Sequence, residues 1–235
     1  MFIYHISNCG LLIELAGKRI LIDAIFCDNN SFNPMRHDVE TDIFEGKEPF
    51  DRIDCMLFTH CHNDHFDKDK VIEYQNRHPE VVITVTEDLK VSEGVIVMKG
   101  DQGTLSVGAL MVTYHKTPHM FTGKDDNVDH VSFVIEGEGK RIFISGDMEL
   151  TEKMADAIKA YGRYDIGILN PIMIANKKWL ERLVMIDIEK KYVYHIPLEE
   201  NDVFGYRRIA IGAVKRHVET LANCIPLLGE LETVM

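Results

Sequence analysis

Thr59-His60-Cys61-His62-Asn63-Asp64-His65 places three histidines and an aspartate close together, directly after the apolar run 55–58. The run is typical of a buried strand. In an extended segment the side chains at i and i+2 point the same way, so His60 and His62 can reach one ion together. Asp64 and His65 lie beyond a turn, where Asn63 or Asp64 can cap a following helix, and they can face a second ion. Unpaired polar groups at a buried strand end would cost several kcal/mol, so this density favours a metal site over a solvated, histidine-rich loop.

The composition is typical of a globular protein. The 235 residues are 46% hydrophobic and 27% charged, which predicts one domain over residues 1–235 with a full core. The formal net charge is −12, and the sequence contains no dense cluster of lysine and arginine. Because affinity for nucleic acids depends largely on cations that neutralise phosphates, a nucleic-acid partner is not expected, and a small-molecule substrate is.

The cysteines and the apolar runs bear on the cellular compartment. The five cysteines are scattered without CxxC spacing and are predicted to be reduced thiols: Cys9, Cys27, Cys55, Cys61 and Cys224. The first residues lack a basic segment followed by a long apolar one, so no secretory signal is expected. No apolar run reaches the roughly 18–20 residues that a membrane span needs. The expected location is the cytoplasm.

Strands and helices alternate along the chain. Apolar runs predict strands at 3–4, 11–13, 19–23, 81–85, 94–98, 103–107, 110–114, 131–136, 141–145, 165–170 and 192–194. Apolar residues at helical spacing predict helices at 68–78, 151–160, 177–190 and 207–222. Segment 27–52 is polar and irregular, which favours a loop at the mouth of a site. Arg36 and His37 are its candidate ligand-facing residues, with solvated side chains as the alternative.

Further residues that can bind metals follow three of these strands. His119 comes after strand 110–114, Asp147 after strand 141–145, and His195 after strand 192–194. A site with two metal ions at the rim of a sheet requires such a pattern, because each ligand must come from rigid backbone at one edge.

The motif His60-x-His62-x-Asp64-His65 resembles the HxHxDH signature of the metallo-β-lactamase fold hydrolases. Residues 9–26 (CGLLIELAGKRILIDAIF) resemble the opening hairpin of this family, and Ile144-Ser145-Gly146-Asp147 resembles its Gly-Asp element. The resemblance is concentrated in residues 8–26, 59–67 and 141–147. It implies an α/β (α+β) fold, a four-layer αββα sandwich of two mixed β-sheets flanked by helices.

The same resemblance implies two divalent metal ions. One ion would take His60, His62 and His119, the other Asp64, His65 and His195, and Asp147 would bridge both. These nitrogen and oxygen donors suit Zn²⁺ best, and also Mn²⁺ or Fe²⁺. A hydroxide bridging the metals would attack a small ester, lactone, amide or phosphoester, as in the subgroup that includes sugar-lactone lactonases. Asp64 would be the catalytic residue that orients this hydroxide or accepts its proton.

Several residues keep two interpretations. His115 competes with His119 as a ligand, and His195 departs from the local order usual in the family, where a proline precedes the histidine. Asp23 either orients a ligand histidine or caps a turn. His130 is either a substrate or proton-shuttle residue or the entry to a strand. Cys61, between two ligand histidines, is expected to pack on the opposite face.

Other functions stay open on this fold. The alternatives are a nuclease or RNA-processing phosphodiesterase, a di-iron redox protein, and a metal-binding member without turnover. The acidic charge argues against the nuclease, and redox members generally add a flavin-binding domain for which 235 residues leave no room. Self-association into a homo-oligomer is compatible with the sequence, which does not specify the substrate.

Overall fold

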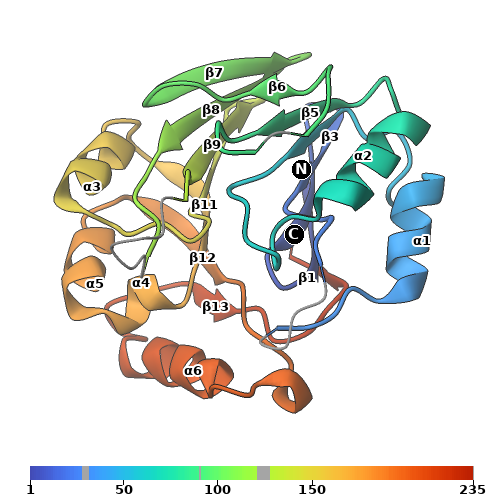
Figure 1. Ribbon diagram of the computed structural model, residues 1–235. Coiled ribbons are helices and arrows are strands. Elements are labelled where there is room, and N and C mark those ends of the chain that lie inside the picture. The colour runs from blue at the N-terminus through green and yellow to red at the C-terminus, as the bar shows by residue number, and fades with distance from the viewer. Residues whose placement is uncertain (28–31, 90, 121–127, 235) are drawn as a thin grey trace.

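Two seven-stranded β-sheets face each other between two layers of helices in the computed structural model (Figure 1). The structure describes residues 1–27, 32–89, 91–120 and 128–234. Figure 1 shows α1 and α2 on one flank of the molecule and α3, α4 and α5 on the other. This arrangement confirms the predicted αββα sandwich. No helix in the described part of the chain is long and apolar enough to cross a membrane.

The first sheet has the strand order β14-β1-β2-β3-β4-β5-β6. Strands β1 to β3 pair antiparallel, and β3 to β6 pair parallel, so the sheet is mixed. The bounds are β1 Phe2–Ser7, β2 Gly10–Leu15, β3 Lys18–Ile22, β4 Cys55–Leu57, β5 Val82–Val85, β6 Ile96–Val97 and β14 Glu232–Thr233. The outer face is covered by α1 His37–Glu45 and α2 Lys68–Arg77.

The second sheet has the order β13-β12-β11-β10-β9-β8-β7 and is also mixed. Its strands are β7 Gln102–Val107, β8 Leu110–Lys116, β9 Val131–Gly137, β10 Lys140–Ile144, β11 Tyr164–Leu169, β12 Ile188–Val193 and β13 Cys224–Pro226. Its outer face packs against α3 Glu152–Lys159, α4 Ile172–Ala175, α5 Lys177–Leu183 and α6 Tyr206–Arg216, with the short 3-10 helix η1 Glu199–Asn201 before α6.

Alternation of side chains divides the core into three layers. Each strand sends successive side chains to opposite faces. Thus Ile142 and Ile144 of β10 lie between the sheets, whereas Phe143 lies under the helices. The central layer contains residues of both sheets, such as Leu11 and Phe133. These layers fix the sheets against each other and hold the strand ends in register.

The carboxyl ends of several strands meet at one edge. Strands β3 and β4 are parallel neighbours, so the residues that follow them, Asp23 and Thr59, lie side by side. In the second sheet β8 runs in the same direction as β10, because both are antiparallel to β9 between them. A bridge between His119 and Met148 then joins the two segments that leave β8 and β10.

Three sequence predictions about element bounds are wrong. Segment 27–52 contains helix α1, which buries Val39, Ile43 and Phe44; residues 28–31 of this segment lie outside the described residues. The expected helix 177–190 ends at Leu183, since residues from 188 pair with β11 and β13 instead. The closing helix ends at Arg216, not at 222. In each case tertiary packing decided what local periodicity could not.

Asn63 and Asp64 do not cap the helix that follows the motif. Helix α2 begins after Asp67, whose side chain accepts hydrogen bonds from the backbone N–H groups of Asp69 and Lys70. Asp64 is therefore left for other contacts.

The cap of α5 gives a first testable prediction. Asn176 Oδ1 accepts hydrogen bonds from Lys178 N at 3.0 Å and Trp179 N at 3.3 Å. Asn176→Ala is expected to lower the free energy of unfolding by about 1 kcal/mol. For a chain of this size the melting temperature should fall by roughly 2–4 °C, measured by circular dichroism. The exposed Lys178→Ala is the control; equal losses in both variants would contradict a role of the cap.

Candidate metal centre

The first group of donor atoms comes from the loop after β4 and the segment after β8. His60 Nε2 lies 3.0 Å from His62 Nδ1 and 3.2 Å from His119 Nε2. The three donor atoms all lie within 4.8 Å of one another. A single cation can therefore be reached by all three rings.

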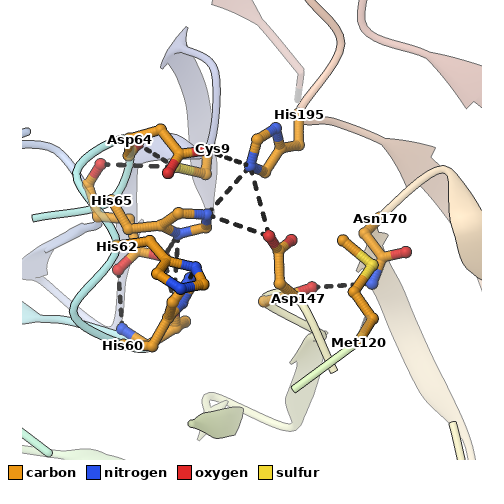
Figure 2. A network of polar contacts seen from close by, with 12 residues as sticks. Cys9, His60, His62, Asp64, His65, Met120, Asp147, Asn170 and His195 are labelled. Atoms are coloured by element: carbon orange, nitrogen blue, oxygen red, sulfur yellow. Dashed lines mark hydrogen bonds and ion pairs between the residues drawn. The ribbon is translucent and has the colours of Figure 1, made fainter. Parts of the chain in front are cut away.

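The second group lies beside the first, and Figure 2 shows the rings of His65 and His195 converging with the carboxylates of Asp64 and Asp147. His65 Nε2 is 3.0 Å from His195 Nε2, which is 3.3 Å from Asp64 Oδ2. His195 has a positive φ of 58°, which is uncommon for a residue other than glycine, and its N–H donates to the Asn8 carbonyl at 2.9 Å. This hydrogen bond helps to hold the strained backbone that directs His195 into the group.

Asp147 lies between the two groups. Its Oδ2 is 3.4 Å from His65 Nε2, 3.6 Å from His195 Nε2 and 3.9 Å from His119 Nε2. Its Oδ1 is buried and has no hydrogen-bond partner among the described residues. A buried carboxylate oxygen without a partner is costly, and a cation at this position would remove the cost.

The outward nitrogens of three histidines are held by hydrogen bonds. His65 Nδ1 donates to Asp23 Oδ2 at 2.9 Å, and His119 Nδ1 donates to the Met120 carbonyl at 2.6 Å. Thr59 donates its hydroxyl to Asp23, so its oxygen accepts from His60 Nδ1 at 3.0 Å. Each ring thus directs its Nε2 towards the centre, as metal-binding histidines do. The residues fit divalent cations that accept nitrogen and oxygen donors, such as Zn²⁺.

Burial and mutual charge shift the pKa values in the centre. Burial, together with the neighbouring histidines, holds the pKa of His60 well below its usual range, so its ring is neutral. Burial would raise the pKa of the carboxylates, but His195 and His65 outweigh it. The pKa of Asp64 falls to about 2, and that of Asp147 falls far below its ordinary value. Burial would also lower the pKa of His65, yet Cys9, Asp147 and Asp23 raise it well above its ordinary value, so a cation at His65 Nε2 would displace a proton.

Asp23 links the two donor groups, because it is hydrogen-bonded both to His65 and to Thr59, which contacts His60. Its Oδ1 accepts from the N–H of Thr59 at 2.8 Å, and its Oδ2 accepts from the Thr59 hydroxyl at 2.7 Å as well as from His65. Asp23 is fully buried, with a positive φ of 46°. Of the two interpretations of Asp23, the structure shows the one in which it orients a histidine.

His130 supports the backbone of Asp147. Its Nε2 accepts from the Asp147 N–H at 2.8 Å, which leaves Nδ1–H to donate to the Thr117 hydroxyl at 2.6 Å. A Cβ at Gly146, which has a φ of +54°, would approach His130 Nε2 to 2.5 Å, so only glycine fits there. His130 directly precedes β9, as the strand-entry interpretation expected, and it also has a positioning role that neither interpretation included.

Other candidates lie away from the two groups. His115 Nε2 is hydrogen-bonded to the Tyr161 hydroxyl at 2.9 Å. Of the two interpretations of Arg36 and His37, the structure agrees with solvated side chains: both residues are exposed, helix α1 begins at His37, and Arg36 pairs with Asp38. Cys61 is half-buried near Asp88, and its thiol pKa is raised to about 11 by burial first and by Asp88 second.

Two features of the centre had no signal in the sequence. The sulfur of Cys9 lies within 4.8 Å of donor atoms of His65 and His195 and donates to the Asp64 carbonyl at 3.1 Å. Burial raises the pKa of its thiol to about 12. Asn8 and Asn33 exchange two hydrogen bonds of 2.8 and 3.0 Å, which tie the segment before α1 to the turn between β1 and β2. Only a fold that places these segments together could reveal either feature.

Comparisons with curated proteins agree with this geometry. A family model described as the beta-lactamase superfamily domain matches residues 18–201. A UPF0173 metal-dependent hydrolase from Paracoccus denitrificans is 31% identical over 175 residues, which cover 70% of each chain. A second UPF0173 metal-dependent hydrolase, from Cereibacter sphaeroides, is 30% identical over 186 residues, covering 72% of this chain and 73% of the relative.

Solved structures share the fold at low identity. The metallo hydrolase Igni18 from Ignicoccus hospitalis has a TM-score of 0.70 at 17% identity and covers 99% of this chain and 97% of its own. An isothiocyanate hydrolase from Delia radicum gut bacteria has a TM-score of 0.66 at 17% identity. The match covers 100% of this chain and 99% of the hydrolase. The diiron β-hydroxylase CmlA from Streptomyces venezuelae has a TM-score of 0.67 at 15% identity; this chain is covered to 99% but spans only 53% of CmlA. With the family model and the curated relatives, these findings show that the chain belongs to the metallo-β-lactamase superfamily of metal-dependent hydrolases.

Proposed function

We propose that residues 1–235 form a single hydrolase domain that holds two divalent metal ions, with Zn²⁺ best suited to the donors. One ion is assigned to His60, His62 and His119, and the other to Asp64, His65 and His195. Asp147 bridges the two. The substrate is a small ester, lactone, amide or phosphoester.

The observation that carries this proposal is the position of Asp147. Its Oδ2 lies 3.4–3.9 Å from Nε2 atoms of both histidine groups, and its Oδ1 is buried with no partner in the described part of the chain. A structural carboxylate would satisfy both oxygens with hydrogen bonds. A carboxylate that faces both donor groups would instead hold cations there, and Asp147 stays ionised because its pKa is held far below its ordinary range despite burial.

When bound, the two ions would lower the pKa of water and polarise the carbonyl or phosphoryl oxygen of the substrate. The protein side chains supply orientation and proton transfer. Asp64 Oδ2, directed towards His195 Nε2 at 3.3 Å, would orient the attacking water or accept its proton. Asp23 holds the ring of His65, and His130 holds the backbone N–H of Asp147, so neither donor has to reorganise during the reaction.

Metal analysis of the purified protein tests the proposal. About two equivalents of Zn, Mn or Fe are expected in the unaltered protein, and both His60→Ala and the isosteric Asp147→Asn should lose metal. His115→Ala removes a histidine outside the two groups and is the matched control, with retained metal expected. Less than about half an equivalent after reconstitution would contradict the two-metal proposal. Loss of metal from His115→Ala would contradict the assignment of His119.

A further inference from the structure

An apolar cavity of about 160 Å³ opens directly beside the metal centre. Asp147 and His195 form its polar end. Every other lining residue in the described part of the chain is apolar or aromatic: Phe32, Met120, Pro171, Ile172, Tyr206 and Ile209. These residues take no part in the proposed hydrolytic chemistry, so the cavity needs a separate explanation.

One wall of the cavity is an aromatic layer that begins at the metal centre. The ring of Phe32 meets the ring of His195 edge-on, with centroids 4.1 Å apart at an interplanar angle of 66°. The same Phe32 ring stacks on the ring of Tyr206, with centroids 5.8 Å apart and an interplanar angle of 7°, so the two rings are nearly parallel. Flat aromatic surfaces of this kind favour planar or compact apolar groups, which gain contact area without a polar partner.

The start of α4 and helix α6 carry further lining residues of the cavity. The buried Asn170 Oδ1 accepts from the N–H groups of Ile172 at 3.0 Å and Met173 at 3.2 Å, which anchors the first turn of α4. Met173 and Ala210 belong to one buried cluster that joins α4 to α6. Ile172 and Ile209 are therefore held in place before any ligand arrives, as is usual for small-molecule sites.

The apolar walls of the cavity offer no cation that could pair with an anionic group. No lysine or arginine is among its described lining residues. Arg207 adjoins Tyr206 in the sequence, but its Nη1 donates to the carbonyls of Pro197 at 3.1 Å and Leu228 at 2.9 Å. An anion placed among these apolar side chains would lose its hydration without gaining a cation from the protein.

We propose that this cavity binds the uncharged apolar part of the substrate, a single ring or a compact branched alkyl group, and places the attached carbonyl at the metal centre that Asp147 and His195 would help to form. A cavity of about 150 Å³ lined by aliphatic and aromatic side chains is known to accept benzene, so one ring fills the available volume. The substrate class is then a small carboxylic ester, lactone or amide that carries one compact uncharged apolar group beside its scissile carbonyl. The reaction rests on the proposed function, whereas binding of the apolar group depends on the cavity alone.

An NMR titration of the metal-loaded protein with benzyl alcohol measures binding to the cavity and tests the proposal. Ile209→Trp adds a large side chain at a partly exposed position of the wall, and about tenfold weaker binding is expected because the ring loses its space. Val218→Trp is the matched control, since Val218 is exposed, follows α6 and lies outside the cavity. Absence of binding, or equal affinity in all three proteins, would overturn the proposal.

A second measurement separates this proposal from the hydrolase function. Benzyl acetate and methyl acetate share the acyl group and differ only in the ring. The kcat/KM value for benzyl acetate, divided by that for methyl acetate, is expected to fall about tenfold in Ile209→Trp and to stay unchanged in Val218→Trp. An unchanged ratio in Ile209→Trp would overturn the cavity assignment while the hydrolase function stands. Benzyl alcohol binding without hydrolysis of either ester would contradict the hydrolase function alone.

Discussion

Replacing Asp23 by asparagine is expected to weaken metal binding by about 10- to 100-fold, although Asp23 touches no ion in the proposed arrangement. The carboxylate accepts three hydrogen bonds, from the N–H and hydroxyl of Thr59 and from Nδ1 of His65. An asparagine has one oxygen and one NH₂ group, so a donor must face either Thr59 N–H or His65 Nδ1–H. Either the ring of His65 loses the contact that fixes its orientation, or Thr59, whose hydroxyl contacts His60, loses the acceptor of its N–H.

Competition with a chromophoric chelator measures the affinity of Asp23→Asn and of the unaltered protein. Asp165→Asn is the matched control, because Asp165 also accepts a backbone N–H, that of Arg141, at 2.9 Å, but does so far from the centre at the start of β11. The control should keep its metal affinity even if it is less stable. Unchanged affinity in Asp23→Asn would show that His65 is oriented by the fold alone.

Replacing Phe133 by alanine is expected to lower the free energy of unfolding by about 3–5 kcal/mol. Phe133 lies on β9, is fully buried, and faces the layer between the two sheets. Its neighbours across the strands are Tyr114 and Ile144, so the surroundings belong to rigid strands that cannot collapse into the space. The cost combines lost apolar burial with the cavity that is left.

Urea unfolding measures this loss, at one fixed metal concentration because bound metal stabilises the folded state by mass action. Phe204→Ala makes the same chemical change at a side chain that is 61% exposed, and it should stay within about 0.5 kcal/mol of the unaltered protein. A loss below about 1 kcal/mol for Phe133→Ala would mean that the two sheets repack around the missing ring.

Much of the fold could be predicted because its signals are local. The apolar run before His60 and the run 141–145 are strands, as expected, and the resemblance of the motif implied the correct sandwich. The errors occur where local signals conflict with tertiary contacts. Residues from 188 onward continue a helical pattern in the sequence, but they form β12 because two neighbouring strands offer hydrogen-bond partners.

The candidate metal centre could likewise be predicted in part. The histidines and aspartates named from the sequence are brought together by the fold, and their role as ligands stays a prediction. His119 rather than His115 enters the first group because the segment after β8 bridges to Met148, whereas His115 remains within the strand.

By itself, the sequence determined the superfamily, the order of the strands that supply donors, and the types of donor atom. These features depend on residue type and on spacing over a few positions, and both can be read from the sequence without knowledge of distant contacts. Only the tertiary structure decided that His65 meets His195, 130 residues further along the chain, that Asp23 and His130 fix the donors, and that Phe32 and Tyr206 line an apolar cavity. Hydrogen bonds and cavities join segments far apart in sequence, and their partners are set by how the two sheets and their helices pack.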